Sequence, residues 1–142
     1  QEKLSIIAEI ENTKHFTSFS VKAKNNYQYA PLADKIQPPI ESWIQGIKDA
    51  KLVITDSFHG CVFSIIFNKP FILISNPDRG MTRFDSLLEL FGLKDRLITS
   101  NNNLYDILDS SINWNRVNDQ LQIWRSLSEN YLKESLVCRA GS

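Results

Sequence analysis

The chain has 142 residues, of which 42% are hydrophobic, enough for one compact domain with a core of its own. Its 16 lysines and arginines balance its 16 aspartates and glutamates, so no overall field would draw it to nucleic acid or to an anionic membrane. No apolar run approaches the roughly 20 residues of a transmembrane helix, and the polar start lacks the features of a signal peptide, so we expect a cytoplasmic protein.

The start of the chain and its two cysteines give further expectations about its extent and its chemistry. The chain begins at Gln1, and a helical pattern follows almost at once, which favours a piece of a longer protein. Cys61 and Cys138 have no metal-ligand spacing and indicate no disulfide framework. We therefore expect no metal site and no cofactor.

The first third of the chain gives mixed signals. Helical spacing of Leu4, Ile7, Ala8 and Ile10 predicts a helix at the start. Residues 16–21 (FTSFSV) are aromatic and β-branched, which predicts a strand. Residues 25–34 have no clear period and are expected to form a surface loop.

From Pro38 onward the pattern predicts alternating helices and strands. Apolar residues at three- and four-residue steps predict a helix that ends near Ala50 and docks on a sheet: Ile40, Trp43, Ile44 and Ile47. Residues 52–55 and 71–74 are short apolar runs typical of buried parallel strands, and residues 60–67 form a helix-length segment between them. The break at 68–70 ends that helix.

The remaining elements complete the α/β pattern. A loop is expected at residues 76–80. The next helix is predicted by its apolar face, Phe84, Leu87, Leu88 and Phe91, and is expected to stop at Gly92. A last strand is expected at residues 97–99. A short helix carries Leu104, Ile107 and Leu108, and residues 115–136 carry the longest pattern, with Leu121, Trp124, Leu127, Tyr131 and Leu132 at a/d-like steps. Trp43 and Trp124 are expected in the core and Trp114 in a loop. The order predicts a Rossmann-like parallel sheet with helices on both faces.

The turn that follows the first of these strands is the strongest candidate for a site. In an open parallel sheet, ligands bind at the carboxyl ends of the strands, and anions favour helix N-termini. Asp56, Ser57, His59 and Gly60 occupy such a turn, and Gly60 permits close backbone approach. The spacing is equally compatible with Asp56 and Ser57 as ordinary N-caps and His59 as a capping or buried structural group.

Two long runs of the sequence resemble the C-terminal signature of the polysaccharide pyruvyltransferase family. The first run comprises residues 40–44 (IESWI) and 49–71 (DAKLVITDSFHGCVFSIIFNKPF), and the second comprises residues 79–84 (RGMTRF), 87–88 and 92–98 (GLKDRLI). They follow the order seen in the family and extend from Pro38 to Ile98. The remainder of the chain is similar only in general character.

The resemblance implies a two-domain fold like that of B-type glycosyltransferases, with the active site between two Rossmann-like halves. This chain, residues 1–142, would be the C-terminal, donor-side domain, and its partner would be the missing N-terminal domain. The family transfers pyruvyl from phosphoenolpyruvate to sugar hydroxyls of a surface polysaccharide, as a ketal. The acceptor would be a saccharide or a lipid-linked saccharide.

The resemblance also implies roles for particular residues. The family histidine corresponds to His59, which would act as a general acid or as a phosphate contact. Other branches have an Arg-Leu pair before it, whereas Ser57 and Phe58 precede it here. Arg79 and Arg83 would lie on the same rim and bind phosphate or carboxylate, with Asp56, Ser57 and Gly60 completing the substrate-binding turn. Each arginine could instead be a solvated surface charge, and Lys69 is expected to be structural.

Two other functions remain open on the sequence. The same fold serves glycosyltransferases that use nucleotide sugars, and function does not follow from fold. A polysaccharide-binding module that keeps the fold without catalysis is the second. The replacement of the Arg-Leu pair by Ser57 and Phe58 is the feature that keeps both open.

Overall fold

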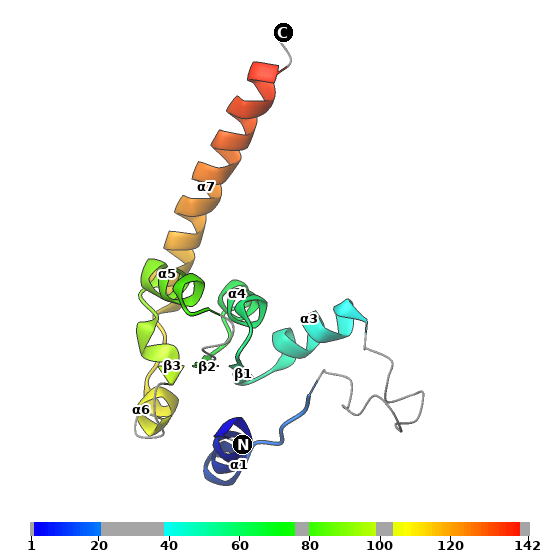
Figure 1. Cartoon of the computed structure of the whole chain (residues 1–142), viewed down its shortest axis with the longest axis vertical. Helices are drawn as coiled ribbons and strands as arrows, with labels where there is room; N and C mark the ends of the chain where they lie inside the picture. The colour runs from blue at the N-terminus through cyan, green and yellow to red at the C-terminus, as the bar shows by residue number, and fades with distance from the viewer. Residues whose placement is uncertain (1, 21–38, 76–79, 99–103, 140–142) are drawn as a thin grey trace.

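The computed structural model describes residues 2–20, 39–75, 80–98 and 104–139 of the chain. They form an α/β body, from which one long helix projects (Figure 1). The expected loop at residues 25–34 lies outside the described residues. No helix in the described part of the chain combines the length and apolar character that crossing a membrane requires.

A small parallel sheet lies at the centre of the body. Its order is β1 (Val53–Thr55), β2 (Phe71–Ile74) and β3 (Leu97–Ile98), with β2 paired in parallel to both neighbours. The three strands and their parallel direction confirm the prediction from the apolar runs. Thr99, the last residue of the expected third strand, lies outside the described residues.

The sheet separates two apolar clusters because successive side chains of a strand point to opposite faces. Phe71 and Leu73 of β2 belong to one cluster, and Ile72 and Ile74 belong to the other. All four are buried, which explains why this strand is an uninterrupted apolar run.

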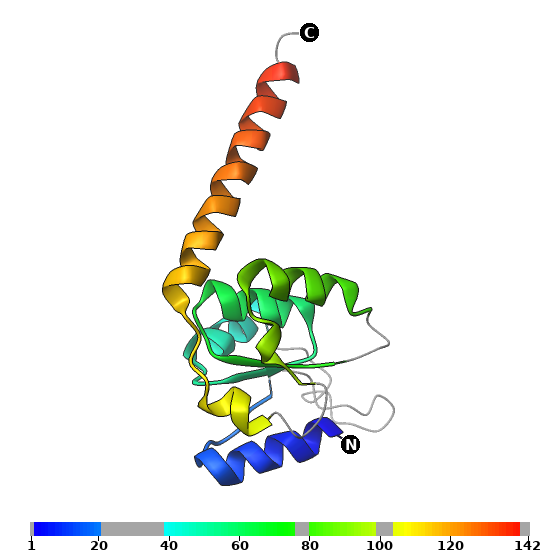
Figure 2. The ribbon, with the colours of Figure 1, turned by 90° about the vertical axis from the view of Figure 1, so that its left-hand side faces the viewer.

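Helices cover both faces of the sheet, as the sequence predicts (Figure 2). On the first face lie α4 (Phe58–Ile66) and α5 (Thr82–Phe91), which contribute Cys61, Ile65 and Leu88 to the first cluster. On the second face lie α1 (Glu2–Lys14) and α6 (Leu104–Asp109), which contribute to the second cluster. The body is therefore a three-layer α/β arrangement.

The ends of α4 and α5 have local causes. Ser57 is extended, with φ −107° and ψ 134°, so α4 begins at Phe58, two residues before the predicted start. The helix ends at Ile66, and Asn68 follows with φ 53° before Pro70. Gly92, with φ 66°, caps α5 in the left-handed conformation that the sequence predicts.

The first twenty residues correct two predictions. The start is helical and Ile10 is buried as the pattern predicts, but the other buried residue is Ile6 and Leu4 is 72% exposed, so the core face is shifted from the predicted one. Residues 15–20 form no strand, and Val21 lies outside the described residues. Phe16 packs beside the second cluster instead, which gives its ring the burial that β-propensity reflects.

The predicted amphipathic helix before β1 is present as α3 (Ile40–Asp49), which ends next to Ala50. Its apolar face contacts α4, whereas the sequence predicts that this face packs on the sheet. The Trp43 and Phe63 rings meet edge to face, with centroids 5.4 Å apart. Ile47 is buried, whereas Ile40 is 67% exposed.

The long C-terminal helix α7 (Trp114–Arg139) has a packed base and a bare outer part. Val117 is 1% exposed, and Trp114 and Leu121 pack beside the first cluster. Trp114 therefore lies in a helix against the core and not in a loop, and Trp124, expected in the core, is 45% exposed. The further exposed apolar residues of this helix are Ile123, Leu127, Tyr131, Leu132 and Leu136.

Candidate functional site

The turn from β1 into α4 presents His59 at the carboxyl edge of the sheet. His59 is the second residue of α4, and its side chain is exposed. Ser57 occupies the N-cap position, its side chain makes no capping hydrogen bond, and its N–H donates to Thr55 Oγ1 at 3.0 Å. The structure thus places the histidine in the first helical turn, as the sequence predicts.

Gly60 brings α4 into close contact with the end of β1. A Cβ atom at this position would lie 2.3 Å from Thr55 Oγ1 and 3.0 Å from Thr55 Cβ, so no larger residue fits without a shift. The carbonyl of Gly60 also accepts a 2.7 Å hydrogen bond from the buried Ser64 hydroxyl. The close approach predicted from the sequence therefore exists, and its partner is the strand beneath the turn.

Asp56 links the turn to the first helix of the chain. Lys3 Nζ donates to Asp56 Oδ1 at 3.2 Å, and the side chains are 37% and 19% exposed. A pair with this much solvent contact contributes at most about 1 kcal/mol to stability. The ion pair connects α1 to the segment that presents His59.

Arg83 reaches the candidate site from the neighbouring βα connection. It is the second residue of α5 and is exposed, and its guanidinium carbon lies 5.5 Å from the centroid of the Phe58 ring. The His59 ring lies 6.1 Å from the same ring. The structure therefore brings Arg83 and His59 to one aromatic side chain, while Arg79 lies outside the described residues.

Lys69 lies at the opposite end of α4 from His59. Its backbone N–H donates to the Ser64 carbonyl at 2.8 Å, in the turn that leads to Pro70 and β2. This placement agrees with the structural role expected for the residue.

Three further residues contact the site, and the sequence predicted a site role for none of them. Thr55 supports Gly60, Lys3 holds Asp56, and Phe58 contacts both His59 and Arg83. The role of Phe58 could have been predicted from the sequence, because it is an aromatic residue next to the histidine in a first helical turn. The other two contacts depend on which elements pack together.

Arg96 was also missed, and it is 2% exposed. Its guanidinium pairs with Asp95, donates to the Ile107 carbonyl at 3.2 Å and contacts the Ser110 hydroxyl. These bonds tie the start of β3 to the end of α6. A hollow of about 260 Å³ beside it is lined by Lys14, Lys51 and apolar side chains, at the amino ends of the strands.

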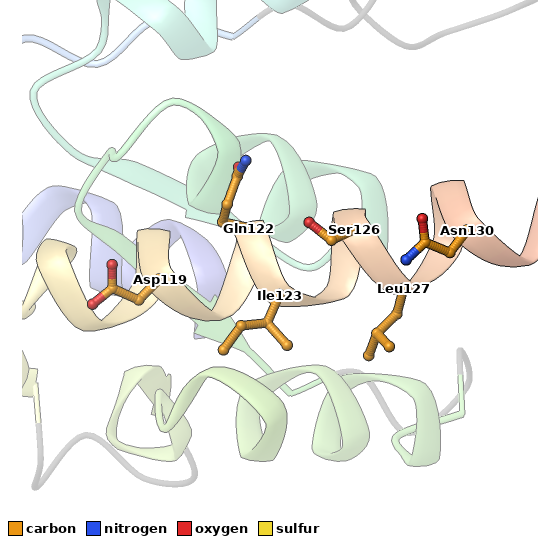
Figure 3. A pocket seen from close by; sticks show the side chains of 6 residues that line it. All are labelled: Asp119, Gln122, Ile123, Ser126, Leu127 and Asn130. Carbon is orange, nitrogen blue, oxygen red and sulfur yellow. The ribbon is translucent and has the colours of Figure 1, made fainter.

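A second hollow, of about 480 Å³, runs along α7 (Figure 3). It is a shallow strip beside Asp119, Gln122, Ile123, Ser126, Leu127 and Asn130. Neither hollow is lined by His59 or Arg83. The side chains of His59 and Arg83 are both exposed, so the candidate site lies at the surface of the described part of the molecule, which also contains no cluster of three metal-ligating side chains.

The comparison with protein families gives one match. A family model described as "Polysaccharide pyruvyl transferase" matches residues 6–79, about half of the chain. The matched segment begins within α1 and ends five residues after β2; it includes the whole turn around His59, whereas Arg83 follows it. No curated protein and no solved structure matches the chain.

Proposed function

The chain belongs to the polysaccharide pyruvyl transferase family, and we propose that it transfers pyruvyl from phosphoenolpyruvate to sugar hydroxyls of a surface polysaccharide, closing a ketal. The observation that supports this best is the geometry around His59. An exposed imidazole stands in the first turn of a helix at the carboxyl edge of a parallel sheet, with a guanidinium at the adjacent ring. Phosphoenolpyruvate is an anion that must be protonated on carbon, so its use requires a proton donor such as the imidazole and a cationic partner such as the guanidinium.

The proposed reaction places one proton transfer at His59. The methylene carbon of the enol accepts a proton, the carbon next to it becomes cation-like, and a sugar hydroxyl attacks that carbon. A second hydroxyl then displaces phosphate and closes the ketal. Of the two hydroxyl protons released, one returns to the acid and the other leaves with the phosphate. Histidine suits the first step because its side chain can exchange a proton near neutral pH.

Anion binding in this proposal uses backbone and side-chain donors together. The first N–H groups of a helix have no intrahelical partner, and the Ser57 side chain forms no capping hydrogen bond. The phosphate or carboxylate of the donor would lie over this turn, with Arg83 as its cationic partner. Arg79 would join from the connection before α5. In this arrangement Asp56, Ser57 and Gly60 form the substrate-binding turn.

We propose further that the chain is the donor-side half of a two-domain enzyme. The exposure of the His59 and Arg83 side chains supports this, because a transferase that excludes water from a cation-like intermediate needs a second wall. The acceptor, a saccharide or a lipid-linked saccharide, would lie between this half and an N-terminal domain. The 142-residue chain alone is then expected to fold without turning over substrate.

The test is a donor comparison with the complete protein. Phosphoenolpyruvate and a panel of nucleotide sugars are offered with an acceptor saccharide, and donor binding, phosphate release and ketal formation are measured. Phosphate release that matches ketal formation supports the proposal. Use of a nucleotide sugar identifies a glycosyltransferase, and binding of saccharide without any donor identifies a binding module. Either result overturns the proposal.

A further inference from the structure

Phe58 is a residue of the candidate site that the proposed reaction does not use. It is the first residue of α4, directly before His59, and its ring is half-buried. Two aromatic rings and one guanidinium lie beside it. His59 and Phe84 meet it edge to face, with centroids at 6.1 Å and 5.8 Å, and the Arg83 guanidinium carbon lies 5.5 Å from its centroid.

The contact with Phe84 fixes this ring to the core. Phe84 is 2% exposed and belongs to the apolar cluster against which Phe58 packs. Phe84 also directly follows Arg83 on α5, as His59 directly follows Phe58 on α4. The two aromatic residues therefore join the first turns of two helices, and each has one of the exposed polar residues of the site as its neighbour in sequence.

The contact with Arg83 leaves the arginine able to bind an anion. The face of the Phe58 ring attracts the guanidinium charge but has no conventional hydrogen-bond acceptor, so the N–H groups can still donate to a phosphate or carboxylate. A free arginine side chain samples many rotamers, and binding would have to restrict them. Holding the guanidinium against a fixed ring removes part of that cost before the ligand arrives.

We propose that Phe58 is a positioning residue, which holds the Arg83 guanidinium beside His59 so that the anionic group of the donor binds next to the proton donor. The inference rests on the proposed function, because it assumes an anionic donor at this edge. It assigns to Phe58 a role in donor affinity and none in proton transfer. Phe58 would therefore act on KM through Arg83.

Steady-state kinetics of the complete protein with phosphoenolpyruvate test this role. Phe58→Leu keeps an apolar side chain but removes the ring, and we expect KM to rise about two- to fivefold with little change in kcat, as loss of an exposed cation–π contact predicts. Phe58→Trp restores a ring and should keep the wild-type KM. In an Arg83→Gln background, Phe58→Leu should have no further effect on KM.

A matched control lies on the same helix. Phe63 also has two ring contacts, with Trp43 and Phe67, and neither partner is an arginine. Phe63→Leu should leave KM unchanged, and thermal melts report any loss of folding in each variant. Independently of any donor, the Nε–H resonance of Arg83 should carry a ring-current shift that Phe58→Leu removes and Phe63→Leu keeps.

The possible failures can be told apart. A wild-type protein that does not bind phosphoenolpyruvate overturns the proposed function, and the inference with it, whatever the Arg83 resonance shows. Wild-type binding together with an unchanged KM in Phe58→Leu overturns the inference alone. A rise in KM that is equally large in the Arg83→Gln background also overturns it, because Phe58 would then not act through Arg83.

Discussion

The α/β body and the outer part of α7 both carry large apolar side chains, but the body buries a core of them, whereas those of outer α7 are exposed. Val117, at the base of α7, is 1% exposed, whereas Tyr131, further along the same helix, is 71% exposed. Both lie within residues 115–136, the segment whose apolar pattern predicts this helix. The comparison teaches that periodicity determines that a helix forms and which side is apolar, while coverage depends on what packs against it.

A similar contrast separates the two hollows from the candidate site. The strip along α7 and the recess at the amino ends of the strands are concave, yet neither is lined by His59 or Arg83. The carboxyl edge of the sheet holds both of these groups, and their side chains are exposed. We therefore expect substitutions at the edge to affect activity, substitutions beneath it to affect stability, and substitutions on outer α7 to affect the stability of this chain little.

The largest expected effect is at His59. His59→Ala in the complete protein should lower kcat about 10²- to 10⁴-fold if the imidazole is the general acid, because that is what such catalysis supplies. Thermal stability should not change, since the side chain is exposed. The control is His15→Asn, at an exposed position with φ 52° that asparagine tolerates, which should keep full activity. Near-normal kinetics of His59→Ala would show that the edge is not the catalytic site.

The next effect tests the support beneath that edge. Gly60→Ala would place a Cβ atom 2.3 Å from Thr55 Oγ1, and we expect it to lower the free energy of unfolding by about 1–3 kcal/mol. Thr55→Ala removes that oxygen, so the double variant should lose less stability than the sum of the two single changes. Urea denaturation of the four proteins measures this coupling. Additive losses would contradict the close contact.

Two alanine substitutions in α7 test the contrast between its packed base and its exposed outer part. Val117→Ala should cost about 2 kcal/mol in the free energy of unfolding of the 142-residue chain, because a buried side chain is lost. Leu127→Ala, at a position that is 54% exposed, should change it by less than about 0.5 kcal/mol. Equal costs at the two positions would show that outer α7 is covered in solution, for example by a second copy of the chain.

At neutral pH the smallest effect concerns Cys61, whose side chain lies in the core. Burial raises the pKa of this thiol from its ordinary 9.0 to about 12, so the folded chain keeps the proton at pH values where the unfolded chain releases it. Stability should be constant below about pH 9 with respect to this group, and fall by up to about 1.4 kcal/mol per pH unit between about 9 and 12.

Alkylation provides the measurement for Cys61. In a Cys138→Ser background, the thiol should resist iodoacetamide at neutral pH in the folded chain and react after unfolding. Rapid alkylation of the native protein would mean that this part of the core opens readily, and the contrast with outer α7 would weaken.

The sequence by itself determined the elements that present the site. The apolar runs of β1 and β2, and the helix-length segment between them, have strong local patterns, so the parallel unit and the place of His59 in a first helical turn follow from residues 52–74 alone. Only the tertiary structure decided what those elements touch. Lys3 and Asp56 are 53 positions apart, Phe58 meets Arg83 across two helices, and residues 15–20 form no strand although their composition favours one. Such contacts, like the coverage of Val117 and the exposure of Trp124, depend on neighbours that lie far away in the sequence, which local patterns do not encode.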